Sequence, residues 1–125
     1  MKFVALFTGQ GSQRVGMLRD MMKTFPMHCK YAMQELDDTL KLSISKYLLQ
    51  DDLPSAQLQQ TSYAQPALLS FSNLLLEILK DERGFTLNPD NCLCALGHSL
   101  GEYAALQGTG AMTYADALQL VVRVF

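Results

Sequence analysis

The chain has 125 residues, 49% of them hydrophobic, and carries a formal net charge of −2 at pH 7. This length and apolar content are enough for one modest core, so we expect one domain or part of one. Positive and negative residues are mixed along the sequence, a pattern that excludes the basic patch of a nucleic-acid-binding protein and the basic face of a membrane-binding one.

A short apolar run opens the chain. Residues 3–7 predict a buried strand, and a glycine-containing loop, residues 8–13, follows at once. The run is too short for a signal-peptide core or a membrane span. A dinucleotide-binding fingerprint would need a glycine in place of Arg14, and a phosphate-binding loop would need a lysine in place of Met17. The loop is therefore interpreted as a glycine turn that presents the Gln10 amide, or simply as a tight exit from the strand.

The middle of the chain is predicted to be helical. Short helices are expected over residues 16–23, 27–40 and 43–50, followed by a polar connector over residues 51–60. The longest predicted helix covers residues 64–83 and ends at Gly84. Ser62 and Gln65 are expected to form its capping box, with Pro66 in the first turn. Because its apolar residues cover more than one face, this helix should be central and buried on several sides.

A second strand, a turn and a helix are predicted farther along the chain. The apolar run over residues 91–96 predicts the strand, and residues 100–109 predict the helix. Ser99 lies in the turn between them, inside a Gly-x-Ser-x-Gly pattern that is typical of a nucleophile elbow. Two apolar strands separated by helices indicate a helix-rich α/β fold with a short parallel sheet.

The residues around this serine suit attack on a carbonyl group. A sharp turn brings neighbouring backbone so close that side chains at Gly97 and Gly101 would collide with it. The amide of Leu100, at the start of the predicted helix, is expected to face an oxyanion formed by attack of Ser99. A second donor is expected from Gln10, in the loop after the first strand.

The cysteines do not form a metal-binding or disulfide pattern. Cys92 and Cys94 are two residues apart in the second strand, so their side chains should point the same way and cannot easily bridge. We interpret them as buried small apolar residues of a reducing compartment. We expect no metal and no cofactor, and a location in the cytoplasm, or in an organelle after removal of a transit peptide.

Three motifs carry a family resemblance. They are residues 7–13 (FTGQGSQ), 65–68 (QPAL) and 97–103 (GHSLGEY). In order and spacing they resemble malonyl-CoA:acyl carrier protein transacylases and the acyltransferase domains of polyketide synthases, and the resemblance spans essentially the whole chain. It implies an α/β-hydrolase-like large subdomain. Within it, residues 1–125 would be a part that ends before the inserted ferredoxin-like small subdomain.

The resemblance also implies a reaction and its partners. Ser99 would attack the thioester of an acyl-CoA, typically malonyl-CoA, and the seryl ester would pass to the phosphopantetheine thiol of an acyl carrier protein. The backbone amides of Gln10 and Leu100 would form the oxyanion hole. No nucleic acid and no membrane are expected as partners.

The chain departs from the family pattern at the general base. In the family this base is a histidine far downstream of the serine, whereas only His28 and His98 occur here. His98 precedes Ser99 on the strand side of the turn, so its ring should point away from the hydroxyl. We interpret His98 as a hydrogen-bonded packing residue and His28 as a helix-surface residue. The chain would then carry only the nucleophile half, and a serine acyl hydrolase or a catalytically silent fragment remain alternatives.

A second departure concerns the substrate's carboxylate. Malonyl-specific relatives carry an arginine at the position that Val124 occupies here, and its planar fork holds the carboxylate. Arg123 lies one residue earlier, about 100° away around a helix, and is the candidate substrate-binding residue. An uncharged acyl group is therefore also allowed.

The end of the chain is predicted to be a helix that opens with a capping box over residues 113–116. Apolar residues continue from there to Phe125 without a glycine cap. Exposed apolar faces of this helix and of the helix over residues 64–83 would favour self-association.

Overall fold

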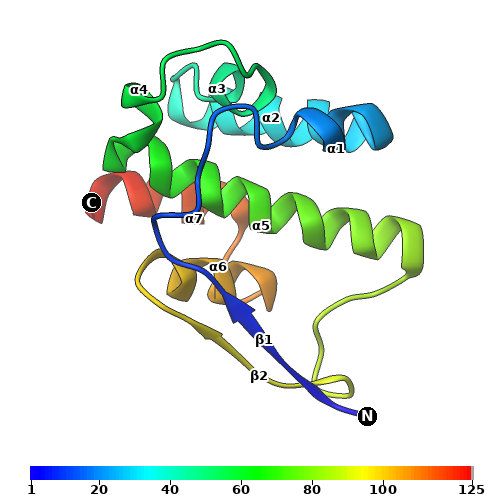
Figure 1. Ribbon diagram of the computed structural model, residues 1–125. Coiled ribbons are helices and arrows are strands. Elements are labelled where there is room, and N and C mark those ends of the chain that lie inside the picture. The colour runs from blue at the N-terminus through cyan, green and yellow to red at the C-terminus, as the bar shows by residue number, and fades with distance from the viewer. Residues whose placement is uncertain (125) are drawn as a thin grey trace.

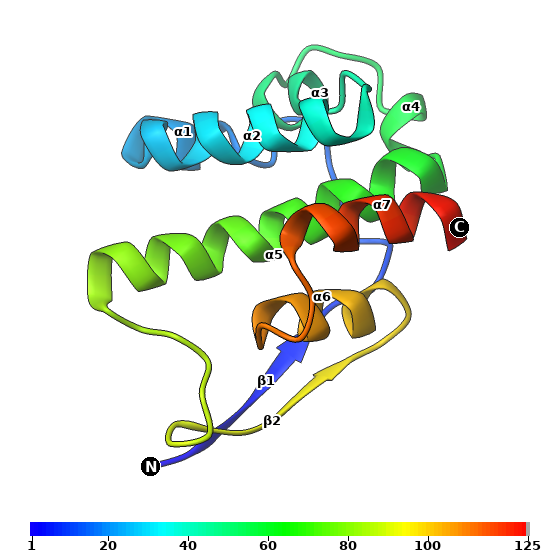
Figure 2. The same ribbon diagram turned by 180° about the vertical axis from the view of Figure 1, so that it is seen from behind.

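A long central helix separates two layers of the structure, a computed structural model that describes residues 1–124. In chain order the elements are β1 (Phe3–Phe7), α1 (Arg19–Thr24), α2 (Pro26–Leu40), α3 (Ser45–Leu49), α4 (Ala56–Gln59), α5 (Thr61–Arg83), β2 (Cys92–Gly97), α6 (Leu100–Gly108) and α7 (Tyr114–Val124). Helix α5 runs between α1 to α4 on one side and α6 with the sheet on the other (Figure 1). Seen from behind, α7 lies beside α5 (Figure 2). The predicted helix-rich α/β fold with a short parallel sheet is confirmed.

Helix α5 is the predicted long helix, and it is central as expected. It begins at Thr61 rather than at residue 64, and it ends before Gly84, whose φ of 63° is the left-handed conformation that favours glycine. It contacts α2, α4, α6 and α7. Only a narrow strip that includes Leu75 and Leu79 is exposed among its large apolar side chains. Burial on several sides is therefore confirmed.

The predicted start of α5 is wrong in its details. Gln60 is the N-cap residue, and no side chain caps the helix there. The expected capping box of Ser62 and Gln65 does not form, because the Gln65 side chain instead donates to the side chain of Gln10 in the loop after β1. Pro66 lies beyond the first turn, inside the helix, where its missing N–H leaves the carbonyl of Ser62 without its helical partner.

The short helices lie near their predicted positions but differ at their ends. Helix α1 begins at Arg19 rather than at residue 16, because Gly16 has a φ of 75° and forms a turn. A Cβ atom at Gly16 would lie 2.9 Å from that of Asp51, so the turn is packed against the segment after α3. The polar connector over residues 51–60 contains the one-turn helix α4.

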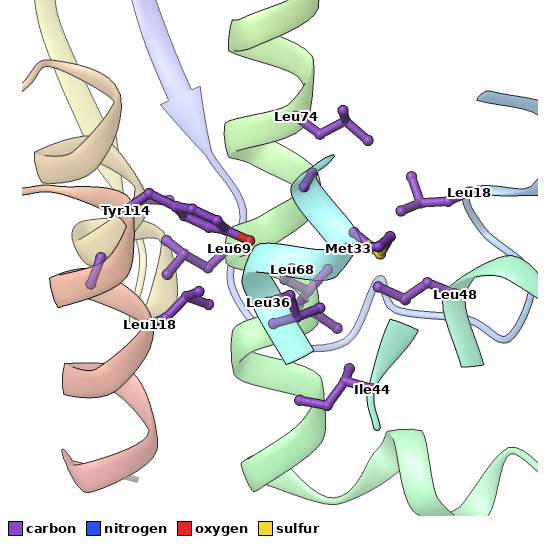
Figure 3. Packing of buried hydrophobic residues seen from close by; sticks show 14 of the residues in the cluster. Leu18, Met33, Leu36, Ile44, Leu48, Leu68, Leu69, Leu74, Tyr114 and Leu118 are labelled. Carbon is purple, nitrogen blue, oxygen red and sulfur yellow. The ribbon is translucent and has the colours of Figure 1, made fainter. Parts of the chain in front are cut away.

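The hydrophobic core lies mainly between the helices. Fully buried side chains from α2, α3, α5, α7 and the adjoining turns meet there, and Figure 3 labels Leu18, Leu36, Ile44, Leu48, Leu69 and Leu118 among them. Burial of one leucine or isoleucine side chain stabilises a fold by about 1.5–3 kcal/mol. The helical layer thus holds the chain together, and the sheet packs on it through α6.

Helix α7 is tied to the core at its beginning. The Asp116 amide donates to Thr113 Oγ1 over 3.1 Å, which confirms the Thr113 half of the predicted capping box. Tyr114 and Ser70 of α5 share a buried hydrogen bond between their hydroxyls. Burial raises the pKa of Tyr114 far above its usual value; the charges of Glu35 and Asp37 add to this, and the Ser70 bond opposes it. Ala117, Leu118 and Val121 are fully buried, so the expectation that α7 would expose its apolar face is wrong for these residues.

The two strands pair in parallel, with an irregularity that reverses one expectation. Phe3 pairs with Cys92, but Val4 pairs with Cys94, so Leu93 is an extra residue in β2. An inserted residue of this kind shifts the alternation of side chains by one position. Cys92 is therefore half-buried with Phe3, whereas Cys94 is exposed with Val4. The prediction that both cysteines are buried and point the same way is wrong.

One face of the sheet is covered and the other is open. Helix α6 packs on both strands, and the opposite face exposes Val4, Leu6, Leu93 and Leu96, with Leu6 75% exposed.

Within residues 1–124, none of the helices is both long and apolar enough to cross a membrane. Nor does this part of the chain contain a group of three or more His, Cys, Asp or Glu residues arranged to hold a metal ion.

Candidate active site

Ser99 lies in a strained turn between β2 and α6. Its φ of 54° and ψ of −117° place a non-glycine residue at positive φ, and it is the N-cap residue of α6. Such a conformation costs of order 1–3 kcal/mol and persists only where the surrounding structure imposes it. Ser99 is exposed. A strained, accessible serine between a strand and a helix is the geometry expected of a nucleophile elbow.

The glycines on both sides of Ser99 allow the backbone to cross itself closely. A Cβ atom at Gly97 would lie 2.0 Å from the carbonyl group of Gly101. A Cβ atom at Gly101 would lie 2.2 Å from the carbonyl oxygen of Phe7, at the end of β1. Neither gap accepts a methyl group, so both predicted collisions are confirmed.

The loop after β1 packs against the turn. A Cβ atom at Gly9 would lie 2.8 Å from the carbonyl oxygen of His98, the residue before Ser99. The glycine therefore brings the backbone that precedes Gln10 into contact with the elbow. Two segments far apart in the sequence thus meet where Gly9 approaches His98.

The first amides of α6 differ in their hydrogen bonding. Gly101 N donates to the His98 carbonyl over 3.0 Å, and Glu102 N donates to the Ser99 carbonyl over 3.0 Å. Leu100 is the first residue of the helix, so its N–H has no acceptor one turn earlier within the helix. Its side chain is only 1% exposed and anchors the start of α6. An N–H in this position carries the positive end of the helix dipole and suits a developing negative charge.

A group of glutamines, whose role the sequence did not predict, holds the loop after β1. Gln65, only 3% exposed, donates its Nε2 to Gln10 Oε1 over 2.8 Å. Gln13, 6% exposed, accepts the Gly11 amide over 2.8 Å and donates its Nε2 to Gln59 Oε1 over 3.0 Å. The available signal was Gln65 itself, a polar residue within an otherwise apolar stretch of a helix.

The two histidines have different surroundings. His98 is exposed rather than packed, and its Nδ1 would lie 3.3 Å from a Cβ atom at Gly9. His28 lies on α2, where its Nε2 is 2.9 Å from a carboxylate oxygen of Asp81 on α5. With 21% of its side chain exposed, His28 is a partly exposed helix residue that links α2 to α5.

Arg123 lies in the last turn of α7 and is exposed. The C-terminal end of α7 lies toward the same end of the molecule as the β2–α6 turn in both ribbon views (Figures 1 and 2). The expectation for Val124, at which the resemblance implies an arginine in malonyl-specific relatives, concerns a side chain that the structure does not describe.

A hollow of about 380 Å³ opens beside the loop after β1. Thr8, Ser12 and Arg14 line it from the loop side, and Leu68 and Phe71 of α5 contribute apolar surface. A hollow lined by a cation, hydroxyl groups and apolar side chains suits a ligand that has a small anionic group next to an apolar part. Arg14 thus lies beside the loop, and the sequence did not predict a binding role for it.

Comparisons with known proteins agree on one family. A model of the acyl transferase domain matches residues 3–124. The chain is 41% identical over 120 residues to the malonyl CoA-acyl carrier protein transacylase of Bacillus subtilis, covering 96% of this chain and 35% of the relative. It is 36% identical over 124 residues to a phenolphthiocerol synthesis polyketide synthase of Mycobacterium marinum, covering 97% of this chain and 6% of that one.

Solved structures show the same relationship. A malonyl-transacylase in complex with its type II polyketide synthase acyl-carrier protein is 33% identical with a TM-score of 0.84, covering 98% of this chain and 37% of that one. An acyl carrier protein S-malonyltransferase of Vibrio cholerae is 35% identical with a TM-score of 0.82, at the same coverage of 98% and 37%. The chain spans about a third of the length of these transacylases.

Proposed function

The chain belongs to the acyl transferase domain family, shared with the malonyl-CoA:acyl carrier protein transacylases, and from this we propose that it serves acyl transfer through a seryl ester on Ser99. The donor would be an acyl-CoA, malonyl-CoA in the first place, and the acceptor the phosphopantetheine thiol of an acyl carrier protein. The observation that carries the proposal is the strained, exposed Ser99, whose neighbour His98 packs against Gly9 in the loop that holds Gln10.

The proposed reaction has two similar steps. Ser99 Oγ attacks the thioester carbonyl, its proton passes to a general base, and the C–S bond breaks to release the CoA thiol. The carrier thiol then attacks the seryl ester, and the serine hydroxyl is restored. In both steps the amides of Gln10 and Leu100 would donate to the oxyanion, an interaction that lowers the barrier most when the donors are held in place beforehand.

We propose that residues outside this chain complete the catalytic unit. His28 is engaged with Asp81 between α2 and α5, and His98 lies before the nucleophile against Gly9. Neither placement matches a base that accepts the Ser99 proton. Residues 1–125 would then be the nucleophile-bearing part of the large subdomain. Arg123 is proposed to contact a substrate carboxylate, with Arg14 beside the loop as the alternative.

Mixing the chain with malonyl-CoA and an acyl carrier protein tests the acceptor. We expect slow labelling of the chain, because oxyanion and binding effects without a base leave a residual rate of roughly 10³–10⁴ over water. The malonyl group should then appear on the carrier thiol, measured by intact-mass spectrometry of both proteins. Release of all malonyl groups as free acid would instead identify a serine acyl hydrolase. Absence of any labelling would identify a catalytically silent chain.

We also propose that the chain self-associates, through the open face of the sheet rather than through α7. Val4, Leu6, Leu93 and Leu96 form a contiguous apolar surface there. Sedimentation velocity at increasing protein concentration should show a rising mean sedimentation coefficient, and Leu6→Lys should reduce this rise. A coefficient that does not change with concentration would contradict the proposal.

A further inference from the structure

We propose that Gln65 is a positioning residue that holds the oxyanion loop through the side chain of Gln10. The inference rests on the proposed function, because it explains how one of the two proposed oxyanion donors is kept in place. The contact that points to it is the hydrogen bond from Gln65 Nε2 to Gln10 Oε1, 2.8 Å long. It joins the central helix to the loop that packs against the Ser99 turn.

Stability alone does not account for a glutamine at this position. Gln65 is 3% exposed and is surrounded in sequence by buried Ala64, Pro66 and Ala67. Its Oε1 atom is buried without a hydrogen-bond partner among the described residues. A buried polar atom left without a partner costs about 1–3 kcal/mol. A leucine of similar size would avoid that cost, so the glutamine is explained by what its Nε2 holds.

The bond fixes an exposed residue of a glycine-flanked turn. Gln10 is exposed and lies in a turn between Gly9 and Gly11, two residues that restrict the backbone least. On the other side of the turn, Gln13 accepts the Gly11 amide and is itself bonded to Gln59. The loop is thus held from both sides by buried glutamines. Of the two, Gln65 is the one that bonds Gln10, whose backbone amide is the proposed oxyanion donor.

A double-mutant cycle tests the inference. We compare Gln65→Leu, Gln10→Ala and the double variant, and measure the rate of Ser99 labelling against malonyl-CoA concentration. Each single variant should lower the maximum rate about 10-fold, less than the 10²–10³-fold loss on removal of an oxyanion donor. The half-saturating concentration should stay the same, because donor placement acts on the transition state. The double variant should be no slower than the singles, since both remove one interaction.

Gln107→Leu is the matched control. Gln107 also donates its Nε2 to a neighbouring amide, Asn73 Oδ1, over 2.8 Å, and its Oε1 is likewise buried with no hydrogen-bond partner among residues 1–124. It lies near the C-terminal end of α6, about 10 Å along the helix from Leu100. This variant should alter thermal stability as Gln65→Leu does but leave the labelling rate unchanged. Additive losses in the double variant, or an equal loss in Gln107→Leu, would overturn the inference.

Amide hydrogen exchange provides a readout that does not depend on activity. In Gln65→Leu the peptide that contains residues 8–13 should exchange faster, while the peptide that contains the Ser99 turn should not change. Unchanged exchange in the loop would overturn the positioning role even if Ser99 is labelled normally. Labelling that persists in Ser99→Ala would refute the proposed function instead, so the two failures are distinguishable. Gln10→Ala, at an exposed position, keeps the test valid if Gln65→Leu does not fold.

Discussion

Ser99→Ala is expected to abolish labelling by malonyl-CoA while leaving the stability of the chain within about 0.5 kcal/mol of the parent. The Ser99 hydroxyl is the proposed attacking group, so no seryl ester can form without it. The stability should hardly change, because Ser99 is exposed and its side chain makes no capping hydrogen bond to α6. Alanine also retains the Cβ atom, so the strain at φ 54° is the same in both proteins.

The measurement is intact-mass spectrometry over a time course, with urea unfolding of both proteins in parallel. Ser62→Ala is the matched control, since Ser62 is exposed in the first turn of α5. The control should be labelled at the parental rate. Labelling of Ser99→Ala at the parental rate would show that another nucleophile, such as the exposed Cys94, reacts and would refute the assignment.

Gly101→Ala is expected to destabilise the chain by about 3 kcal/mol or more, which is a large share of a typical total of 5–15 kcal/mol. The added methyl group would lie 2.2 Å from the carbonyl oxygen of Phe7 and 3.1 Å from that of Thr8. Both atoms belong to the backbone at the end of β1, so no side-chain rotation relieves the overlap. Either β1 or the start of α6 must move, and the site would open.

Gly84→Ala separates steric overlap from loss of glycine's flexibility. Gly84 has a φ of 63°, but a Cβ atom there meets nothing within 4 Å. Its replacement should cost only about 1–2 kcal/mol for the left-handed conformation. Urea unfolding followed by circular dichroism compares the two variants. Equal losses of stability in the two variants would contradict the close approach of α6 and β1.

The amino-acid sequence alone was enough to predict the features that depend on local backbone geometry. The short apolar run before a glycine turn predicted β1, and the Gly-x-Ser-x-Gly pattern predicted the strained turn at Ser99. Glycine is the usual residue where two stretches of backbone pass very close to each other, so Gly97 and Gly101 indicated that approach before the structure was known. The three motifs also identified the family correctly.

Interactions between distant segments were decided only in the tertiary structure. A glutamine can complete a capping box at the start of its own helix, or it can bond a distant loop. The residues next to Gln65 in the sequence could therefore not show that it bonds Gln10 rather than the start of α5. The extra residue Leu93 places Cys92 and Cys94 on different faces, because strand alternation depends on pairing with β1. Periodicity and turn chemistry are properties of neighbouring residues, whereas these contacts depend on which faces of α5, β1 and β2 meet after folding.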